Sequence, residues 1–444
     1  MVATPDPSVK MRTLKNNFHL AYRFILLVML LVLAGCQTTN NATRTDNSGQ
    51  SQPLMVGPSG YTLQEKNNLT YTYNSDIYLD VVIPIFDPGL PLDAHGEIDY
   101  ERVEEENIWP QLRRAEAKRF AIQTKQALEK IRAFGSVSVV PTANTTGDLF
   151  LLGSVDYSDS EIVKITATVV DSTGKIWGKR QFEHRVSTGF FRDSLNDNKN
   201  PYGPVFRQMG DYVYTLLLQR SEARKKTIKD TAMLRYAQAY SPEVFNQYVG
   251  TTLVGGMFGL QERYEFTLLS LPSENDAMLN RIESLRHQEQ MFIDRLQDQY
   301  TAFDMNTVEA YRAWQKETLP EAKAARKARS DKTTKQIIGG LLTAAAIIGA
   351  TQADSSLQGV LVAGAAVGAV YSFKRASELD AELSVHKATL NEMGENLDIA
   401  LGAQSLELDN KTIELTGTAG EQYEQWKAHL YKIYQLEKTP YKAL

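Results

Sequence analysis

The order of strand and helix patterns between residues 78 and 186 constrains the fold most strongly. Residues 78 to 85 form an apolar run typical of a buried strand, and a proline-rich stretch follows it. Pro110 then opens a segment with helical spacing of apolar residues, which ends at Gly135. Four further strands are expected at 136–140, 149–155, 162–170 and 176–186, with a hairpin turn at 171–174. This order predicts a small mixed α/β sandwich of the α+β class, with helices on one face of the sheet.

Helical periods replace the strand pattern from about Tyr202 onward. An interrupted heptad is formed by Ile282, Leu285, Phe292, Leu296 and Phe303. A more regular seam is formed by Leu379, Leu383, His386, Leu390, Met393, Leu397 and Ala400. We therefore expect a long, coiled-coil-like helical region after the sandwich domain. Near the end, a hairpin is expected at 404–417, followed by a helix at 421–436 whose aromatic stripe faces the core.

A segment rich in glycine and alanine lies between the two heptad patterns. Its arms, 337–350 and 359–371, carry small residues at spacings that let two helix backbones approach closely. The positions that would pack in this way are Gly340, Gly349, Gly359, Gly364 and Gly368. The segment resembles the glycine-zipper regions of bacterial envelope lipoproteins, which implies a helical hairpin over 337–371. It either dips into a bilayer or packs as the tip of a water-soluble helical pair.

The amino terminus has the layout of a signal peptide. An apolar run at 24–34 follows several basic residues, and at about half the roughly 20 residues of a membrane span it is too short to be one. The next residues, Leu33, Ala34, Gly35 and Cys36, resemble the lipobox of bacterial lipoproteins. The resemblance implies cleavage before Cys36 and acylation of its thiol; the alternative is an ordinary signal peptide with an incidental cysteine. Gln37 in place of aspartate favours the outer membrane, and translation is expected to start at either Met1 or Met11.

A second resemblance concerns the strand-rich block, which we expect to fold alone over residues 76–186. The stretch Asp148-Leu-Phe-Leu-Leu-Gly-Ser-Val, after a helix and a short strand, resembles the periplasmic α/β modules of CsgG-like and LpoB-like outer-membrane lipoproteins. The expected organisation is a signal peptide (1–35), a lipidated tether (36–75), an α+β domain (76–190), a helical region (200–336), the Gly/Ala hairpin (337–371) and a helical arm with the terminal hairpin and helix (372–444).

Residues typical of catalysis and metal binding are scattered. The histidines are His19, His95, His184, His287, His386 and His429, and no pair has the spacing of a helical metal site. Gly255 to Gly259 lacks the strand and lysine of a phosphate-binding loop, so a flexible turn is expected there. Glu104, Glu105 and Glu106 suggest a solvated loop, and the acids Asp156, Asp159 and Glu161 suggest a hydrogen-bonded turn. We expect no catalytic residue, metal or cofactor.

The net charge and the expected cellular location together indicate a class of function. The formal net charge of -5 argues against a nucleic-acid ligand. We expect a non-enzymatic scaffold or assembly factor, anchored by acylated Cys36 at the periplasmic face of the outer membrane, with copies of itself or envelope proteins as partners. The alternative is an oligomeric export or pore-forming subunit. An enzyme acting on peptidoglycan would need a site assembled from distant Asp and Glu residues.

Overall fold

The fold is taken from a computed structural model of the chain. It describes residues 71–255, 262–343, 389–392, 394–399, 401, 404–408 and 411–437. The chain divides into two compact units, Met1–Met55 and Val56–Leu444, and every described residue belongs to the second unit.

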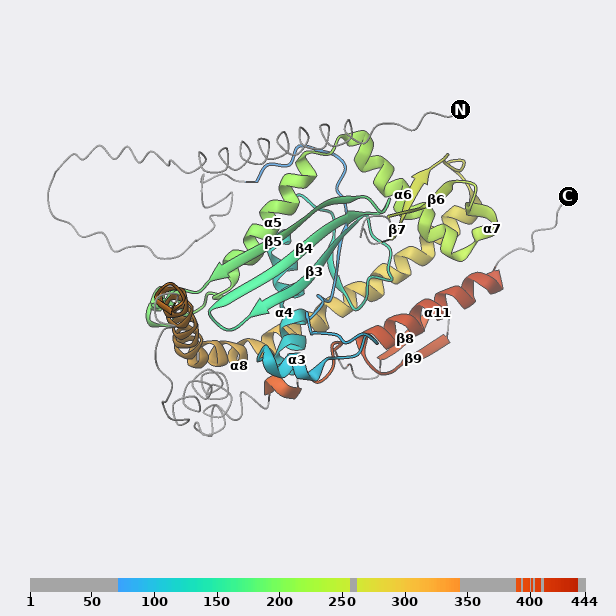
Figure 1. Ribbon diagram of the computed structural model, residues 1–444. Coiled ribbons are helices and arrows are strands. Elements are labelled where there is room, and N and C mark those ends of the chain that lie inside the picture. Colours follow the sequence, from blue (N-terminus) through green and yellow to red (C-terminus); the bar gives the residue numbers. More distant parts are fainter. Residues whose placement is uncertain are drawn as a thin grey trace, which may run out of the picture. The chain divides into compact units, whose positions relative to one another are not determined.

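A five-stranded mixed sheet forms the centre of this unit (Figure 1). Its strands are β1 (Val81–Pro84), β2 (Val137–Val140), β3 (Leu149–Ser158), β4 (Ile162–Asp171) and β5 (Ile176–Arg185). The spatial order is β2-β1-β3-β4-β5, with β1 parallel to β2 and β3, and with antiparallel pairing from β3 to β5. The predicted order of strands and helix is confirmed. Gly174, at a φ of +77°, makes the tight turn between β4 and β5.

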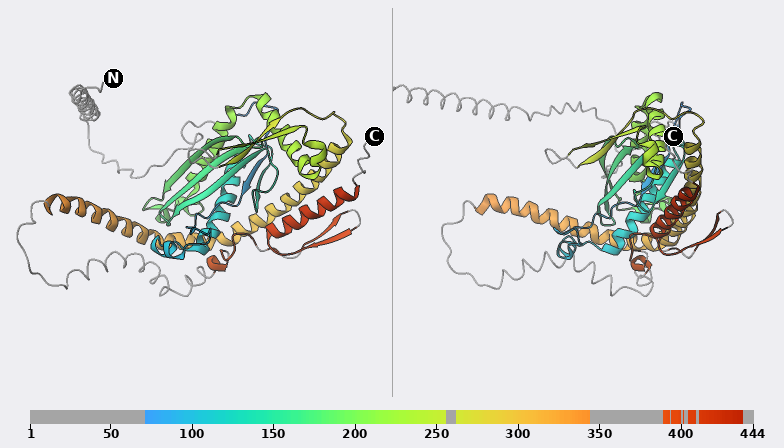
Figure 2. Two further views of the ribbon diagram at one scale, coloured as in Figure 1. Left: turned by 45° about the vertical axis from the view of Figure 1, so that its right-hand side comes forward. Right: turned by 90° about the vertical axis from the view of Figure 1, so that its right-hand side faces the viewer.

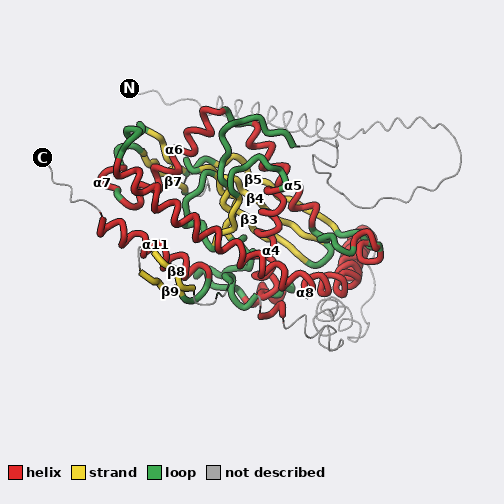
Figure 3. The backbone as a smooth tube through the Cα atoms, turned by 180° about the vertical axis from the view of Figure 1, so that it is seen from behind, coloured by secondary structure: helices red, strands yellow, loops and turns green. Residues whose placement is uncertain are grey.

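The helices α4 (Pro110–Glu129) and α5 (Gly203–Leu218) cover one face of the sheet, as predicted. Figure 1 shows the strands in front of these helices, and Figure 3 shows the helices in front from the opposite side. Side chains in β4 alternate accordingly: Val163, Ile165, Ala167 and Val169 are buried, whereas Lys164, Thr166 and Thr168 reach solvent. A short helix, α3 (Tyr100–Glu105), precedes α4. It includes Glu104 and Glu105, where a loop was expected, and their side chains are exposed.

The region after Tyr202 contains a β-hairpin that the sequence pattern did not predict. After the short turns η1 (Phe190–Arg192) and η2 (Ser194–Asn196) and the helices α5, α6 (Glu222–Tyr240) and α7 (Pro242–Phe245), the chain forms β6 (Val249–Val254) and β7 (Arg263–Leu268). The expectation of helices alone was wrong here because only Val249 of this hairpin is buried, so apolar alternation is weak. A tertiary contact supports the hairpin instead: the Phe266 N–H donates to the Thr173 carbonyl at 2.9 Å.

A long helix, α8 (Ala277–Thr343), packs against α4, β2 and α6. The five residues of the interrupted heptad, Ile282 to Phe303, are all buried at these contacts. The terminal hairpin, β8 (Gln404–Leu408) with β9 (Lys411–Leu415), and the helix α11 (Ala419–Glu437) confirm the predicted elements. Figure 2 shows α11 alongside α8 in both views, and Tyr423, Trp426 and Tyr434 of its aromatic stripe are buried.

The Gly/Ala hairpin and most of the second heptad seam lie outside the described residues. Of that seam, Leu390 is fully buried and Leu397 is 41% exposed, while His386 is not among the described residues. The coiled coil and the hairpin therefore stay predictions. Buried residues from the sheet and from the helices up to Tyr434 form one hydrophobic cluster.

Candidate functional site

The helix α4 carries charged side chains into the protein interior. Arg113, Glu116, Lys118 and Arg119 are each at most 6% exposed, although α4 also supplies apolar core residues such as Phe120 and Leu128. Burying a charge is unfavourable unless the charge is paired and hydrogen-bonded. The partners of these four residues therefore show which elements pack against the charged face of α4.

Glu116 is the centre of the first buried network. Its carboxylate accepts hydrogen bonds from the Ser158 hydroxyl at 2.6 Å and the Tyr311 hydroxyl at 2.7 Å, which join α4 to β3 and α8. The Arg113 Nε lies 3.5 Å from the same carboxylate. Burial raises the pKa of Glu116, and the Arg113 charge and the two hydroxyls oppose that rise.

Arg119 ties α4 to α8 one turn further along. Its guanidinium lies 3.1 Å from the Asp304 carboxylate and donates to the Thr307 hydroxyl, and it sits over the Tyr311 ring at 4.9 Å. Burial lowers the pKa of Arg119 and the Asp304 charge opposes this, so the group stays a cation. Glu116, Arg119 and Tyr311 are almost fully buried, and Tyr311 of α8 contacts both of the α4 residues, so the arrangement can fasten the two helices together.

Lys118 holds residues 394–399 against α4. Its ammonium donates to the Asn396 carbonyl at 2.9 Å and lies 4.8 Å from the centre of the Phe303 ring. Burial lowers the pKa of Lys118 to about 8. At Gly394 an added Cβ would collide with the Gln111 carbonyl oxygen, so only glycine allows this approach to α4.

A further cluster of buried side chains, mostly aromatic, joins α6, α8 and α11. The Tyr423 hydroxyl donates to the Glu289 carboxylate and lies 2.7 Å from the Thr145 hydroxyl. The Phe292 ring stacks on Trp426 at 5.8 Å between centroids, and Tyr240 contacts Tyr434 edge-on. These contacts explain why the aromatic stripe of α11 is buried.

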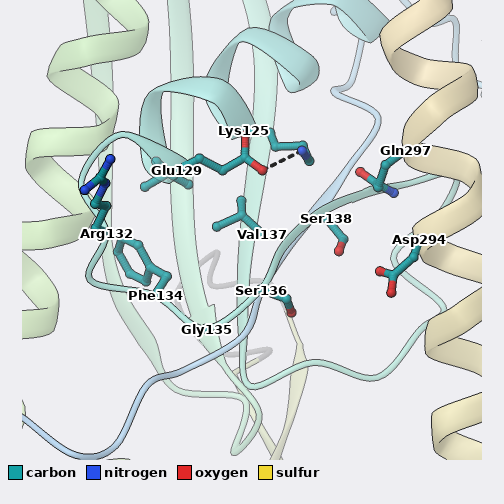
Figure 4. A pocket seen from close by; sticks show the side chains of 11 residues that line it. Lys125, Glu129, Arg132, Phe134, Gly135, Ser136, Val137, Ser138, Asp294 and Gln297 are labelled. Carbon is teal, nitrogen blue, oxygen red and sulfur yellow. Dashed lines mark hydrogen bonds and ion pairs between the residues drawn. The ribbon is translucent and has the colours of Figure 1, made fainter.

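A cleft of about 480 Å³ opens beside β2, the edge strand of the sheet (Figure 4). We call it the β2-edge cleft. Its lining residues are Lys125, Leu128, Glu129, Arg132, Phe134, Gly135, Ser136, Val137, Ser138, Asp294 and Gln297. The end of α4 forms one wall and α8 forms the other, and Lys125 and Glu129 make a 2.7 Å ion pair on the first wall. Its size is within the range of about 300–1,000 Å³ common for ligand sites.

Gln297 of α8 occupies part of the free edge of β2. Its carboxamide oxygen accepts from the Val139 N–H at 2.9 Å, and its nitrogen donates to the Val139 carbonyl at 2.9 Å. The side chain thus replaces one peptide unit of a neighbouring strand. Neither the cleft nor the buried networks were predicted, because they depend on contacts between residues far apart in the chain, such as Val139 with Gln297, 158 positions later, and Glu116 with Tyr311, 195 positions later.

The candidate site residues named in the sequence analysis do not lie together in the β2-edge cleft or in the buried networks. Gly340 lies within α8. The other residues proposed for lipidation, signal cleavage and helix packing lie outside the described residues: Cys36, Leu33, Ala34, Gly35, Gly349, Gly359, Gly364 and Gly368. His95 and His287 are exposed, whereas His184 is buried, and burial lowers its pKa to about 4. Asp159 accepts from the N–H groups of Glu161 and Ile162, as the predicted hydrogen-bonded turn requires.

Glu161 has a partner that the sequence did not indicate. It is buried and forms an ion pair with Arg326 of α8. Gly255 follows β6 with a φ of +100°, and the other residues of the turn expected over Gly255 to Gly259 lie outside the described residues.

Within the described part of the chain, no group of three or more His, Cys, Asp or Glu side chains is placed to hold a metal ion. No helix in that part combines the length and the apolar character needed to cross a membrane. Comparison of the chain with family models, curated proteins and solved structures finds no match.

Proposed function

We propose that this protein is a lipid-anchored component of the bacterial outer membrane that works at the periplasmic face as a non-enzymatic scaffold or assembly factor. The observation that carries the proposal is the amino-terminal sequence, in which basic residues, an apolar run and the Leu33 to Cys36 motif coincide. Acyl chains on Cys36 would supply about 0.8 kcal/mol of membrane binding per buried CH₂ group.

The buried charges fit a structural role better than a catalytic one. Glu116 and Arg119 are paired with groups on α8, and Lys118 with residues 394–399, so each stabilises a contact between elements. Catalytic groups need access to a substrate, and the side chains of Glu116, Tyr202 and Tyr311 are at most 3% exposed. This supports a scaffold over a peptidoglycan enzyme.

A second candidate function is an oligomeric export or pore-forming subunit. The small residues of 337–371 favour it, since Gly364 and Gly368 have the spacing of closely packed membrane helices. Basic residues on both sides of this segment would face anionic phospholipids of the inner leaflet. Membrane-inserted oligomers, detected by crosslinking in intact cells, would favour this candidate over the scaffold.

The anchor is tested by Cys36→Ala. Without the thiol, the chain should stay unprocessed or leave the membrane fraction, and it should not incorporate a labelled fatty acid. Gln37→Ala, which leaves the thiol in place, is the matched control and should still be labelled. An alanine variant that matures and sediments with outer membranes would contradict lipid anchoring through Cys36.

A further inference from the structure

The free edge of β2 offers backbone hydrogen bonds to the β2-edge cleft. The Ser136 carbonyl accepts from the Val81 N–H at 2.8 Å and therefore points toward β1. Since amide groups of successive strand residues point to opposite edges, those of Val137 and Val139 point away from β1. Gln297 pairs with Val139, which leaves the Val137 N–H and carbonyl facing the cleft.

Two opposite charges lie on different sides of this edge. Figure 4 places Arg132 and Asp294 on opposite sides of the strand, with Val137 between them. Asp294 accepts a hydrogen bond from Gln290 at 2.8 Å, and among the described residues neither Asp294 nor Arg132 takes part in an ion pair. Lys125 and Glu129 neutralise each other on the α4 wall. The cleft thus presents one unpaired cation and one unpaired anion.

We propose that the β2-edge cleft binds an extended peptide segment of a partner protein. The segment adds beside β2 as a short strand, pairs with the N–H and carbonyl of Val137, and places an acidic side chain toward Arg132 and a basic one toward Asp294. Strand addition of this kind takes affinity from the backbone and selectivity from flanking pockets. The Gln297 carboxamide already shows that this edge accepts a peptide-like group.

The two walls of the cleft determine the kind of occupant. Since α4 and α8 both line the cleft, the sheet edge of a second folded copy would meet α8, and we therefore assign the cleft to a single extended chain. Leu128, Phe134 and Val137 form the buried floor of the cleft and are at most 8% exposed, so the accessible part of its lining is mainly polar and charged. The occupant is therefore a short extended segment with one acidic and one basic side chain.

The inference rests on the proposed scaffold function only in assigning the peptide to a partner protein. Its test uses the chain from residue 37 onward, without signal or lipid. Failure of this test would leave the anchoring prediction standing, and failure of lipidation would leave this test unaffected.

The probe is a displayed library of random twelve-residue linear peptides, selected on the wild-type chain. Enriched peptides are then synthesised and their Kd is measured by calorimetry for wild type, Val137→Pro and Val137→Ala. Proline removes the outward N–H at a place where edge strands tolerate it, and alanine removes only the valine methyl groups. We expect proline to weaken binding about tenfold, the equivalent of one hydrogen bond, and alanine to weaken it less.

A second measurement does not depend on the folding of any variant. Two forms of the synthetic peptide are made, one with the odd-numbered and one with the even-numbered peptide bonds N-methylated. Only one row of amides faces β2, so one form should lose binding and the other should keep it. Asp294→Lys should weaken peptides that carry the basic residue by about twofold to fivefold. Absence of enriched peptides, or binding that neither N-methylation nor Val137→Pro weakens, would overturn the proposal.

Discussion

At the scale of single residues, the charged side chains of α4 are the least expected feature. The apolar spacing of 110–129 predicts a helix but does not indicate where its charged side chains lie. In the structure, α8 and residues 394–399 cover the charged face of α4, so that Glu116 contacts Tyr311 and Lys118 contacts Asn396. These partners follow 195 and 278 positions later in the chain, and periodicity within one helix carries no information about them.

Replacement of Glu116 should change how stability depends on pH. The folded protein raises the pKa of Glu116, so it holds this proton more tightly than the unfolded chain does. The contribution of Glu116 to the free energy of unfolding therefore falls as the pH rises from below 4.5 through the raised pKa. A glutamine side chain does not titrate, so the stability of Glu116→Gln relative to wild type should increase across that window.

Urea unfolding of both proteins at a series of pH values measures this effect. Glu105→Gln, at an exposed position of α3, controls for the loss of one negative charge. A stability difference between Glu116→Gln and wild type that stays constant with pH would count against it. Glu116→Ala, which leaves the buried Arg113 without its carboxylate, should lower the free energy of unfolding by about 3–5 kcal/mol.

At the scale of elements, the sequence pattern succeeds where burial is strong and local. The strands of the central sheet, α4 and α11 have apolar periods of their own, and Leu128 and Val139 are fully buried, as their pattern predicts. The Leu128→Ala and Val139→Ala variants should each have a free energy of unfolding about 1–5 kcal/mol below that of wild type, measured by urea unfolding.

The β6–β7 hairpin was missed because its support comes from Thr173 in another hairpin. The β2-edge cleft depends on α8 standing beside β2, which no local pattern indicates.

The contact between α4 and residues 394–399 can be tested at one glycine. In Gly394→Ala the new Cβ would meet the Gln111 carbonyl, so the segment must move away from α4 and the Lys118 hydrogen bond must weaken. We expect a loss of about 1–3 kcal/mol in the free energy of unfolding. Gly189→Ala is the matched control, because nothing lies within 4 Å of its added Cβ. Equal stability losses in the two variants would argue against a close contact at Gly394.

At the scale of the whole molecule, one hydrophobic cluster joins the sheet to helices far along the chain. This changes what we expect of an isolated fragment 76–186. Such a fragment lacks α5, whose Tyr212 contacts Phe182 and whose Phe206 contacts Phe120, and it lacks the Asp304 partner of Arg119. We expect a broad thermal transition for the fragment and a sharp one for residues 37–444. A sharp transition of the fragment in calorimetry would show that the block folds alone.

The last prediction concerns the Gly/Ala segment 337–371, most of which lies outside the described residues. If Gly364 and Gly368 line a seam between two helix backbones, leucine at both positions introduces side chains where there is no room and should separate the arms. The property that the double-leucine variant loses depends on whether the seam lies in lipid or in water. In lipid, the membrane association of a Cys36→Ala background should weaken; in water, only stability or oligomer size should change.

Vesicles of outer-membrane phospholipids separate these two settings. The chain from residue 37 onward is mixed with them with and without the two leucines, and the bound fraction is measured by flotation. Alanine at both positions is the matched control, since it keeps small side chains at the seam and should bind like wild type. Binding that only the leucine form loses would place the seam in lipid and favour the pore-forming candidate. Absence of binding by all three forms would leave Cys36 as the only anchor of the proposed scaffold, because the segment would then have no affinity for the membrane of its own.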